Sequence, residues 1–500
     1  MGLSCLQKEI IDIKGNLIVR ASAGTGKTYT LVSKIEKEIK ENYTHKSIAA
    51  ITFTIKAANE IRERMSIDLS EHFIGTNNSF VIEEIIKPFM KDAYGLCFDR
   101  DMSTDYSIKI KTYEEGIEQI KRQGIISSYE NAKENFVFDL AQNIVKMSKA
   151  CKLYLKSKYF KIYIDEYQDC DKSMNDLFMY FCDKLHIDIF IVGDEKQSIY
   201  TWRGACPKGF TEVWNKKEFK KKRLLDNFRS VIQIQNYSNL LFEETSSLYN
   251  KINDLNNIIL LQTVEDKWET TVISKLDLNK GFALLRFTNK NAKFGAEILS
   301  RAGLECVYIP PLPIANVTTE VGWLYMAIAK YSLLEKYSVY DFIADIPSEG
   351  EENNHVISTM KGYLNNIKKS CANKGCFYKN VSKLVQYFGY QTKNKDLDKL
   401  YQTITDASFH VAFESEKYKN VAMTLHSSKG LEFEQVVIFA EDYDLSDKTK
   451  LYNHYVAVTR AKSKLIIVYT DNVFSRLYIK TVSELLEKNK LSLGDVMLIE

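Results

Sequence analysis

A glycine-rich loop near the start of the sequence constrains the fold of this chain more than any other feature. The apolar run 17–19 precedes the loop, and Leu31, Ile35 and Ile39 recur after it at helical spacing. The loop itself reads Ala21-Ser22-Ala23-Gly24-Thr25-Gly26-Lys27-Thr28. Its glycines let backbone N–H groups approach a phosphate, and the start of the following helix favours negative charge. The order strand, loop and helix predicts a phosphate-binding loop, although Ala21 stands where the strict motif has glycine.

Two groups of short apolar runs indicate two α/β domains. Runs at 17–19, 48–53, 162–164 and 187–192 are each followed by a helical pattern, and runs at 282–285, 436–439 and 465–468 repeat this arrangement. Such runs are typical of buried parallel strands. With 500 residues, of which 45% are hydrophobic, the chain is long enough for several packed cores. We therefore predict two parallel sheets flanked by helices.

Each predicted α/β domain is interrupted by an insertion. The segment 81–150 is mostly helical in pattern, so residues 1–80 and 151–226 are expected to form the first domain around it. Pro310, Pro311 and Pro313 can continue neither a helix nor a central strand. They mark a second helical insertion at 311–414, with helical pieces at 321–331 and 381–388, so residues 227–310 and 415–500 are expected to form the second domain.

Two acidic residues follow the predicted strand 162–164. A parallel strand delivers polar side chains at its carboxyl end, where Asp165 suits Mg²⁺ and Glu166 suits activation of a water molecule. Thr28 is the second expected ligand of Mg²⁺, and Lys27 is placed to reach nucleotide phosphates. These residues predict a site for a nucleotide and magnesium.

A series of motifs in order along the chain resembles the UvrD/Rep/PcrA type of superfamily 1A DNA helicases. Besides the loop and the acidic pair, the motifs are Ile191-Val192-Gly193-Asp194 with Gln197-Ser198-Ile199-Tyr200 and Trp202-Arg203-Gly204-Ala205, then Asn227-Phe228-Arg229-Ser230, Thr424-Leu425-His426, Lys429-Gly430-Leu431-Glu432-Phe433 and Val458-Thr459-Arg460-Ala461. The resemblance implies two RecA-like P-loop NTPase domains, ATP and Mg²⁺ as cofactors, and DNA helicase activity with 3′-to-5′ polarity.

The same resemblance assigns nucleotide contacts. It implies Gln7 at the adenine edge, Phe228 stacked on adenine, Glu432 near the ribose and Gln197 at the γ-phosphate. Arg229 and Arg460 are expected to reach the γ-phosphate from the second domain, where arginine fingers are worth roughly 10³–10⁵ in rate. Gln197, Arg229 and Arg460 complete the expected catalytic set, whose other members are Lys27, Asp165 and Glu166.

A sequence-independent DNA track needs aromatic side chains interleaved with hydrogen-bond donors. Tyr200, Trp202 and Arg203 provide both within four residues, and Thr52, Phe53, Thr76 and His426 resemble other positions of the helicase track. The chain departs from the helicase pattern at Asn77-Asn78 and at Glu195-Lys196. The resemblance therefore assigns no DNA contact to Asn77 or Asn78.

The formal net charge of +3 does not by itself indicate a nucleic-acid-binding protein, so any such site is expected to be local. The densest basic segment comprises Lys216, Lys217, Lys220, Lys221, Lys222 and Arg223. We interpret it as an exposed helix face, with contact to duplex phosphates as the alternative.

No stretch of 18 apolar residues and no signal-peptide pattern occurs, so no membrane association is expected. The nine cysteines form no C-x-x-C pair, which favours a reducing, cytoplasmic location.

The segments 73–77, 84–89 and 157–161 resemble the helicase subunits of the Gabija anti-phage system more closely. This resemblance implies a bacterial cell, single-stranded or end-containing DNA as the substrate, and a hetero-oligomer with the nuclease GajA. Two alternatives remain open: a housekeeping DNA repair helicase that unwinds duplexes unaided, and a complex-bound, DNA-activated ATPase without processive unwinding.

Overall fold

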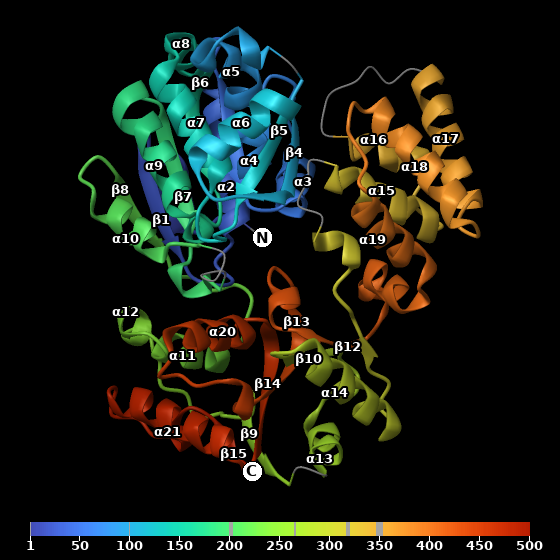
Figure 1. Cartoon of the computed structure of the whole chain (residues 1–500). Coiled ribbons are helices and arrows are strands. Elements are labelled where there is room, and N and C mark those ends of the chain that lie inside the picture. The colour runs from blue at the N-terminus through green and yellow to red at the C-terminus, as the bar shows by residue number, and fades with distance from the viewer. Residues whose placement is uncertain (1, 100, 200–203, 265–266, 317–320, 347–353) are drawn as a thin grey trace.

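The computed structural model describes residues 2–99, 101–199, 204–264, 267–316, 321–346 and 354–500. Figure 1 shows two sheet-containing parts, one above the other, and a group of helices beside the upper part. Both sheets are parallel and flanked by helices, which confirms the predicted α/β fold class.

The first sheet has six parallel strands in the order β3-β2-β6-β7-β1-β8. The strands are β1 (Leu17–Ala21), β2 (Ser47–Thr52), β3 (Phe73–Thr76), β6 (Tyr159–Ile164), β7 (Asp188–Gly193) and β8 (Lys220–Leu224). Successive residues of β1 face opposite sides: Leu17 and Val19 join one core, while Ile18 joins the other. Because both faces are covered, the inner strands read as continuous apolar runs.

Helices cover both faces of this sheet. They are α1 (Cys5–Asp12), α2 (Lys27–Lys40), α3 (Ile55–Arg64), α9 (Lys172–Tyr180) and α10 (Pro207–Asn215). Leu31 and Ile35 of α2 pack on the same core as Leu17 and Val19, as the spacing predicts.

The segment between β3 and β6 is mainly helical, as predicted. Its helices are α4 (Asn77–Val81), α5 (Lys87–Tyr94), α6 (Tyr113–Gln123), α7 (Phe136–Met147) and α8 (Lys149–Lys158). A two-stranded parallel sheet, β4 (Ser103–Ile110) with β5 (Ile125–Tyr129), was not predicted. Polar residues alternate along β4, so it has no continuous apolar run.

The second sheet has seven parallel strands in the order β11-β12-β10-β13-β14-β9-β15. The predicted strands are β10 (Phe282–Arg286), β13 (Phe433–Phe439) and β14 (Ala461–Thr470); the others are β9 (Ile258–Thr263), β11 (Val307–Tyr308), β12 (Asn420–Thr424) and β15 (Leu498–Ile499). Its helices are α11 (Ile232–Leu240), α12 (Glu243–Ser246), α13 (Trp268–Lys275), α14 (Asn289–Arg301), α20 (Lys448–Val458) and α21 (Val473–Glu487).

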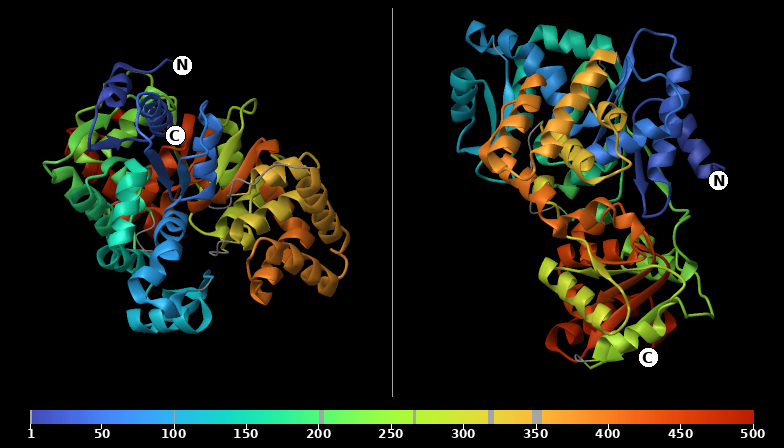
Figure 2. Two further views of the ribbon diagram at one scale, coloured as in Figure 1. Left: turned by 90° about the horizontal axis from the view of Figure 1, so that it is seen from above. Right: turned by 90° about the vertical axis from the view of Figure 1, so that its right-hand side faces the viewer.

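Between β11 and β12 the chain forms a helical bundle with a core of its own. Its helices are α15 (Gly322–Leu333), α16 (Val339–Ala344), α17 (Asn354–Lys369), α18 (Lys374–Tyr387) and α19 (Asn394–Thr405). Figure 2 shows the bundle extending to one side of the two sheets. Lys393, just before α19, pairs with Asp105 of β4, so the bundle also contacts the insertion of the first sheet. Among the described helices, none has the length and apolar character needed to cross a bilayer.

The interpretation of the basic segment as a helix face is wrong. Residues Lys220–Leu224 form β8, which pairs in parallel with β1 at the edge of the first sheet. Exposed lysines at a sheet edge oppose pairing with a further strand, which explains this composition. The sequence lacks an apolar run here because only Leu224 of the strand is buried.

Candidate nucleotide site and groove

The glycine-rich loop joins the end of β1 to the start of α2. Gly24 and Gly26 both have φ of +75°, in the left-handed region that favours glycine. A Cβ on Gly24 would lie 2.5 Å from Asn227 Oδ1, and one on Gly26 would lie 2.9 Å from Gln7 Nε2. Conformation and close approach thus both require glycine at these two positions.

The two predicted acidic residues follow β6 directly. Asp165 is buried, and its burial together with the charge of Glu166 raises its pKa. Burial also acts to raise the pKa of Glu166, but Lys27 and Lys429 outweigh that effect and hold it below its ordinary value. The Lys27 ammonium lies 3.5 Å from Glu166 Oε1. The Glu166 carboxyl is therefore held ionised beside Lys27, while the Asp165 carboxyl lacks a comparable cationic partner.

These residues fit a magnesium ion. Asp165 Oδ1 accepts a hydrogen bond from the backbone N–H of Glu166, and burial disfavours its charge without a nearby cation. Thr28 occupies the first turn of α2. No group of three or more metal-ligating side chains occurs in the described part of the chain. The single carboxylate of Asp165 suits Mg²⁺, because Mg²⁺ is usually held by one or two carboxylates together with substrate phosphates and water.

Arg460 of the second sheet reaches Gln197 of the first. Its Nη2 lies 3.5 Å from Gln197 Oε1, and its other donors bind the carbonyls of Val456 and Leu431. Burial and the neighbouring Arg229 lower the pKa of Arg460 to about 10, so it remains cationic near neutral pH. Two predicted catalytic residues from opposite sheets therefore meet.

Arg229 lies beside the glycine-rich loop, with its Cβ 2.8 Å from where a Cβ on Gly24 would be. Its Nε donates to Glu432 Oε2 at 2.6 Å, and its Nη1 donates to Thr459 O at 3.1 Å. Glu432 also pairs with Lys462 at 3.0 Å. In this conformation Glu432 holds Arg229, which is a contact that the sequence did not predict.

The two residues expected at adenine differ in their surroundings. Phe228 is 47% exposed, and its backbone N–H donates to Gly24 O at 2.9 Å. Gln7 is buried, and its Nε2 donates to Thr25 O at 3.3 Å. Phe228 thus offers a free ring face beside the loop, whereas Gln7 contacts the loop itself.

Further residues that were not singled out as site residues join the two sheets. Lys429 donates to Asp169 Oδ2 at 2.6 Å and to Gln197 O at 3.2 Å. Tyr455 of α20 donates to Asp194 Oδ2 at 3.1 Å and accepts from Ala23 N at 3.2 Å. Each contact spans more than 200 residues of sequence. Both residues lie within or beside the helicase-like motifs, so a closer inspection of the motifs' polar residues would have suggested them.

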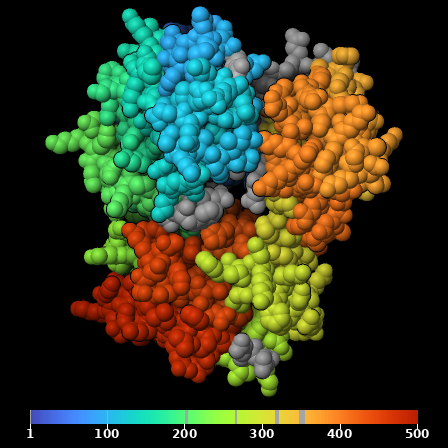
Figure 3. Space-filling view, in the orientation of Figure 1, coloured from blue at the N-terminus to red at the C-terminus, as the bar shows by residue number. Residues whose placement is uncertain are grey.

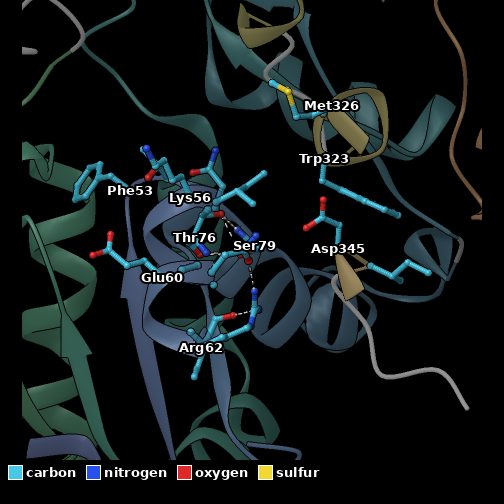
Figure 4. Close-up of a pocket in the computed structure, with 18 of the residues that line it drawn as sticks. Phe53, Lys56, Glu60, Arg62, Thr76, Ser79, Trp323, Met326 and Asp345 are labelled. Carbon is cyan, nitrogen blue, oxygen red and sulfur yellow. Dashed lines mark hydrogen bonds between the residues drawn. The ribbon is translucent and has the colours of Figure 1, made fainter. Parts of the chain in front are cut away.

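The candidate DNA residues are distributed over separate places. Phe53 and Thr76 line a groove of about 3350 Å³ between the first sheet and the helical bundle. Figure 3 shows the bundle, in orange, close beside the upper part of the molecule. Figure 4 shows Phe53, Lys56 and Thr76 on one wall and Trp323 and Met326 on the other.

Thr52 and His426 lie outside this groove lining, and Tyr200, Trp202 and Arg203 lie outside the described residues. Thr52 is buried at the end of β2, where its hydroxyl donates to Thr54 O at 2.9 Å. His426 follows β12 and packs edge-on against Phe287 at 6.0 Å between ring centroids. Phe287 is 41% exposed and was not predicted, although it lies only two residues after the strand run 282–285.

Residues 7–203 match an AAA domain family, and residues 419–468 match the UvrD-like helicase C-terminal domain family. The Gabija protein GajB of Bacillus cereus (strain VD045) is 39% identical, over 97% of this chain and 99% of that protein. The ATP-dependent DNA helicase Rep of Buchnera aphidicola subsp. Acyrthosiphon pisum is 23% identical, over 94% of this chain and 95% of that protein. Rep of Escherichia coli (strain K12) is 25% identical, over 49% of this chain and 44% of its own length. The chain therefore belongs to the UvrD-like DNA helicase family and, within it, to the family of the Gabija protein GajB.

Proposed function

We propose that this chain is an ATP-driven motor that moves along single-stranded DNA. The observation that carries the proposal is that side chains from both sheets meet at the glycine-rich loop, at a place named here the cleft: Lys27, Asp165 and Glu166 come from one side, and Arg229 and Arg460 come from the other. Because a nucleotide would contact both sides, binding and hydrolysis would change the separation of the two sheets. Such a change is the elementary step of a motor.

The proposed motor has two halves and two insertions. Residues 1–80 and 151–226 would form the first RecA-like domain and 227–310 with 415–500 the second. The insertions would be 81–150 and 311–414. The separate cores of the two sheets and of the bundle support the two halves and the second insertion, whereas the first insertion shares the core of the first sheet.

The residues of the cleft have distinct proposed roles. Lys27 and the loop N–H groups would hold phosphates, and Thr28 with Asp165 would hold Mg²⁺, which neutralises phosphate charge when bound. Glu166, kept ionised by Lys27 and Lys429, would accept a proton from the attacking water. Gln197, Arg229 and Arg460 would meet the charge that develops on the γ-phosphate, while Gln7, Phe228 and Glu432 would contact the nucleoside.

We further propose that the motor acts in Gabija anti-phage defence, in a hetero-oligomer with the nuclease GajA. The similarity to GajB over nearly the whole length of both chains supports this role. The proposed substrate is single-stranded or end-containing DNA, with 3′-to-5′ polarity inferred from the helicase family.

One alternative function has an observation in its favour. The alignment with Buchnera Rep extends over 622 positions for a chain of 500 residues, so Rep has segments that this chain lacks. A shortened motor suits a DNA-activated ATPase that works within a complex without processive unwinding.

Displacement of streptavidin from biotinylated oligonucleotides tests these proposals. Purified chain with ATP is expected to clear the 5′ end and not the 3′ end, since a 3′-to-5′ motor moves towards the 5′ end. ATP hydrolysis without displacement from either end would favour the complex-bound ATPase. Co-expression with a GajA homologue then tests the partnership, and separate elution of the two proteins would contradict it.

A further inference from the structure

A second lysine points at the glycine-rich loop. Lys196 lies in the 3₁₀ turn Glu195–Gln197 after β7, and its Nζ donates to Ser22 Oγ at 2.9 Å. Only 9% of Lys196 is exposed. The ring centroids of Tyr455 and Phe242, both from the second-sheet side, lie 5.0 Å and 5.7 Å from Nζ. The ammonium group is thus enclosed between the loop and the opposite wall of the cleft.

No carboxylate lies within 4.0 Å of this ammonium group in the described part of the chain. The neighbouring Glu195 pairs instead with Arg20 at 3.1 Å and accepts from Thr211 at 2.8 Å. Asp194 Oδ2 accepts from Gln197 and Tyr455. A buried charge without an ion-pair partner is costly. Burial accordingly lowers the pKa of Lys196, and the nearby Lys27 acts in the same direction, whereas the charges of Asp194, Glu244 and Glu195 act to raise it. Lys27 already pairs with Glu166 at 3.5 Å, so a bound anion would supply the direct partner that Lys196 lacks.

We propose that Lys196 is a second phosphate-binding lysine, which contacts the terminal phosphate of a nucleoside triphosphate and lets the site distinguish triphosphate from diphosphate. The inference rests on the proposed nucleotide function of the cleft. Three features support it: Ser22 and Lys27 belong to the same loop, the Lys196 ammonium donates to Ser22, and Tyr455 contacts both that ammonium and Ala23 N. A nucleoside diphosphate lacks the terminal phosphate whose negative charge would neutralise the Lys196 ammonium. This role would explain why the chain departs from the helicase pattern at Glu195-Lys196.

The main rival is a structural tie in which Lys196 only holds Ser22 in place. Lys196→Gln separates the two ideas, because glutamine can still donate a hydrogen bond to Ser22 but carries no charge. Lys196→Met removes both the hydrogen bond and the charge. Lys221→Met, at the exposed edge strand β8, is a matched control for loss of a lysine away from the cleft.

The experiment measures the Kd of the full chain for magnesium AMP-PNP and for magnesium ADP by calorimetry. For Lys196→Gln we expect the Kd for AMP-PNP to rise about 10-fold to 100-fold, as for loss of one charge-assisted hydrogen bond, with the Kd for ADP changed less than about 3-fold. Lys196→Met should show the same selective loss, and Lys221→Met should match the wild type. If only one of the two Lys196 variants folds, the change in its Kd for AMP-PNP relative to ADP tests the proposal.

An equal loss for both nucleotides, or no loss for Lys196→Gln, would overturn the proposal. Failure of the underlying function looks different: wild-type protein would then bind neither nucleotide, or Lys27→Ala would bind both as wild type does.

Discussion

At the residue scale, the glycines of the loop show how local conformation and function coincide. Gly24 adopts a positive φ and leaves no room for a Cβ beside Asn227 and Arg229. Gly303 has a comparable φ of +89° but open space around it. Alanine substitutions at these two positions therefore separate the destabilisation due to backbone strain from the effect of a steric clash at the cleft.

Gly24→Ala is expected to destabilise the fold and also to abolish detectable nucleotide binding. The added methyl group would displace either the loop or residues 227–229, which follow β8. Gly303→Ala should show only the backbone cost of about 1–2 kcal/mol. Urea unfolding and calorimetric titration with AMP-PNP check the pair. Nucleotide binding by Gly24→Ala at wild-type strength would show that the loop does not need this approach.

The pair formed by Phe287 and His426 is a second residue-scale feature. An exposed ring next to a predicted DNA-contacting histidine suits stacking of a base. Phe287→Ala is expected to weaken binding of oligo-dT roughly 5-fold to 100-fold, as for loss of one stacked base. Fluorescence anisotropy measures this effect. Phe294→Ala, which removes a 58% exposed phenylalanine on α14, should bind as wild type does, and an equal loss in both variants would argue against a specific role for Phe287.

At the element scale, the sequence predicts most of the inner strands and misses the edges, together with the inner strands β9 and β12. β1, β2, β6, β7, β10, β13 and β14 are buried on both faces, so each leaves an apolar run. By contrast, β8 is mostly cationic and β4 is half polar because one side of each meets solvent. The same reasoning holds for the site. The loop and acidic residues follow from motif chemistry, whereas the contacts that Lys429 and Tyr455 make depend on the approach of the two sheets, which no local pattern specifies.

The helix α20 contains a buried histidine whose ionisation is coupled to stability. His454 Nε2 lies 2.9 Å from the Tyr237 hydroxyl and 3.4 Å from that of Tyr478, joining α20 to α11 and α21. Burial lowers the pKa of His454 from 6.5 to about 3. The unfolded chain therefore binds a proton below pH 6.5, which the folded chain does not bind until near pH 3. The stability from this residue is complete above pH 6.5 and is lost as the pH falls through that window.

The wild-type protein is expected to lose about 1.4 kcal/mol of unfolding free energy per pH unit between pH 6 and pH 4 relative to His454→Gln. Glutamine can still bond to the two hydroxyls but does not titrate. Urea denaturation at several pH values measures the difference. Parallel pH profiles of the two proteins would mean that His454 ionises with its ordinary pKa in the fold.

At the scale of the whole molecule, polar contacts tie the two sheets together and tie the bundle to the insertion. Lys429 with Asp169 and Tyr455 with Asp194 are among those that join the sheets, and Lys393 with Asp105 joins the bundle to the insertion. Polar contacts of this kind suit parts that move relative to one another.

Reversing the charge of either Lys393 or Asp105 is expected to separate the bundle from the insertion, whereas the double exchange Lys393→Glu with Asp105→Lys should restore the contact. Fluorescence energy transfer between dyes on α17 and α6 reports their distance. Lower transfer in each single variant and recovery in the double variant are the expected results. Unchanged transfer in both single variants would show that this ion pair does not hold the two parts together.

The proposed motor requires that the cleft between the sheets hydrolyses ATP and that DNA stimulates this hydrolysis. The most direct measurement is the steady-state rate of ATP hydrolysis by the full chain, alone and with single-stranded DNA, beside Lys27→Ala and Arg460→Ala. We predict that DNA raises the wild-type rate, that Lys27→Ala abolishes hydrolysis, and that Arg460→Ala lowers it by roughly 10³-fold or more. Hydrolysis that persists in both variants would contradict the assignment of this cleft as the catalytic site.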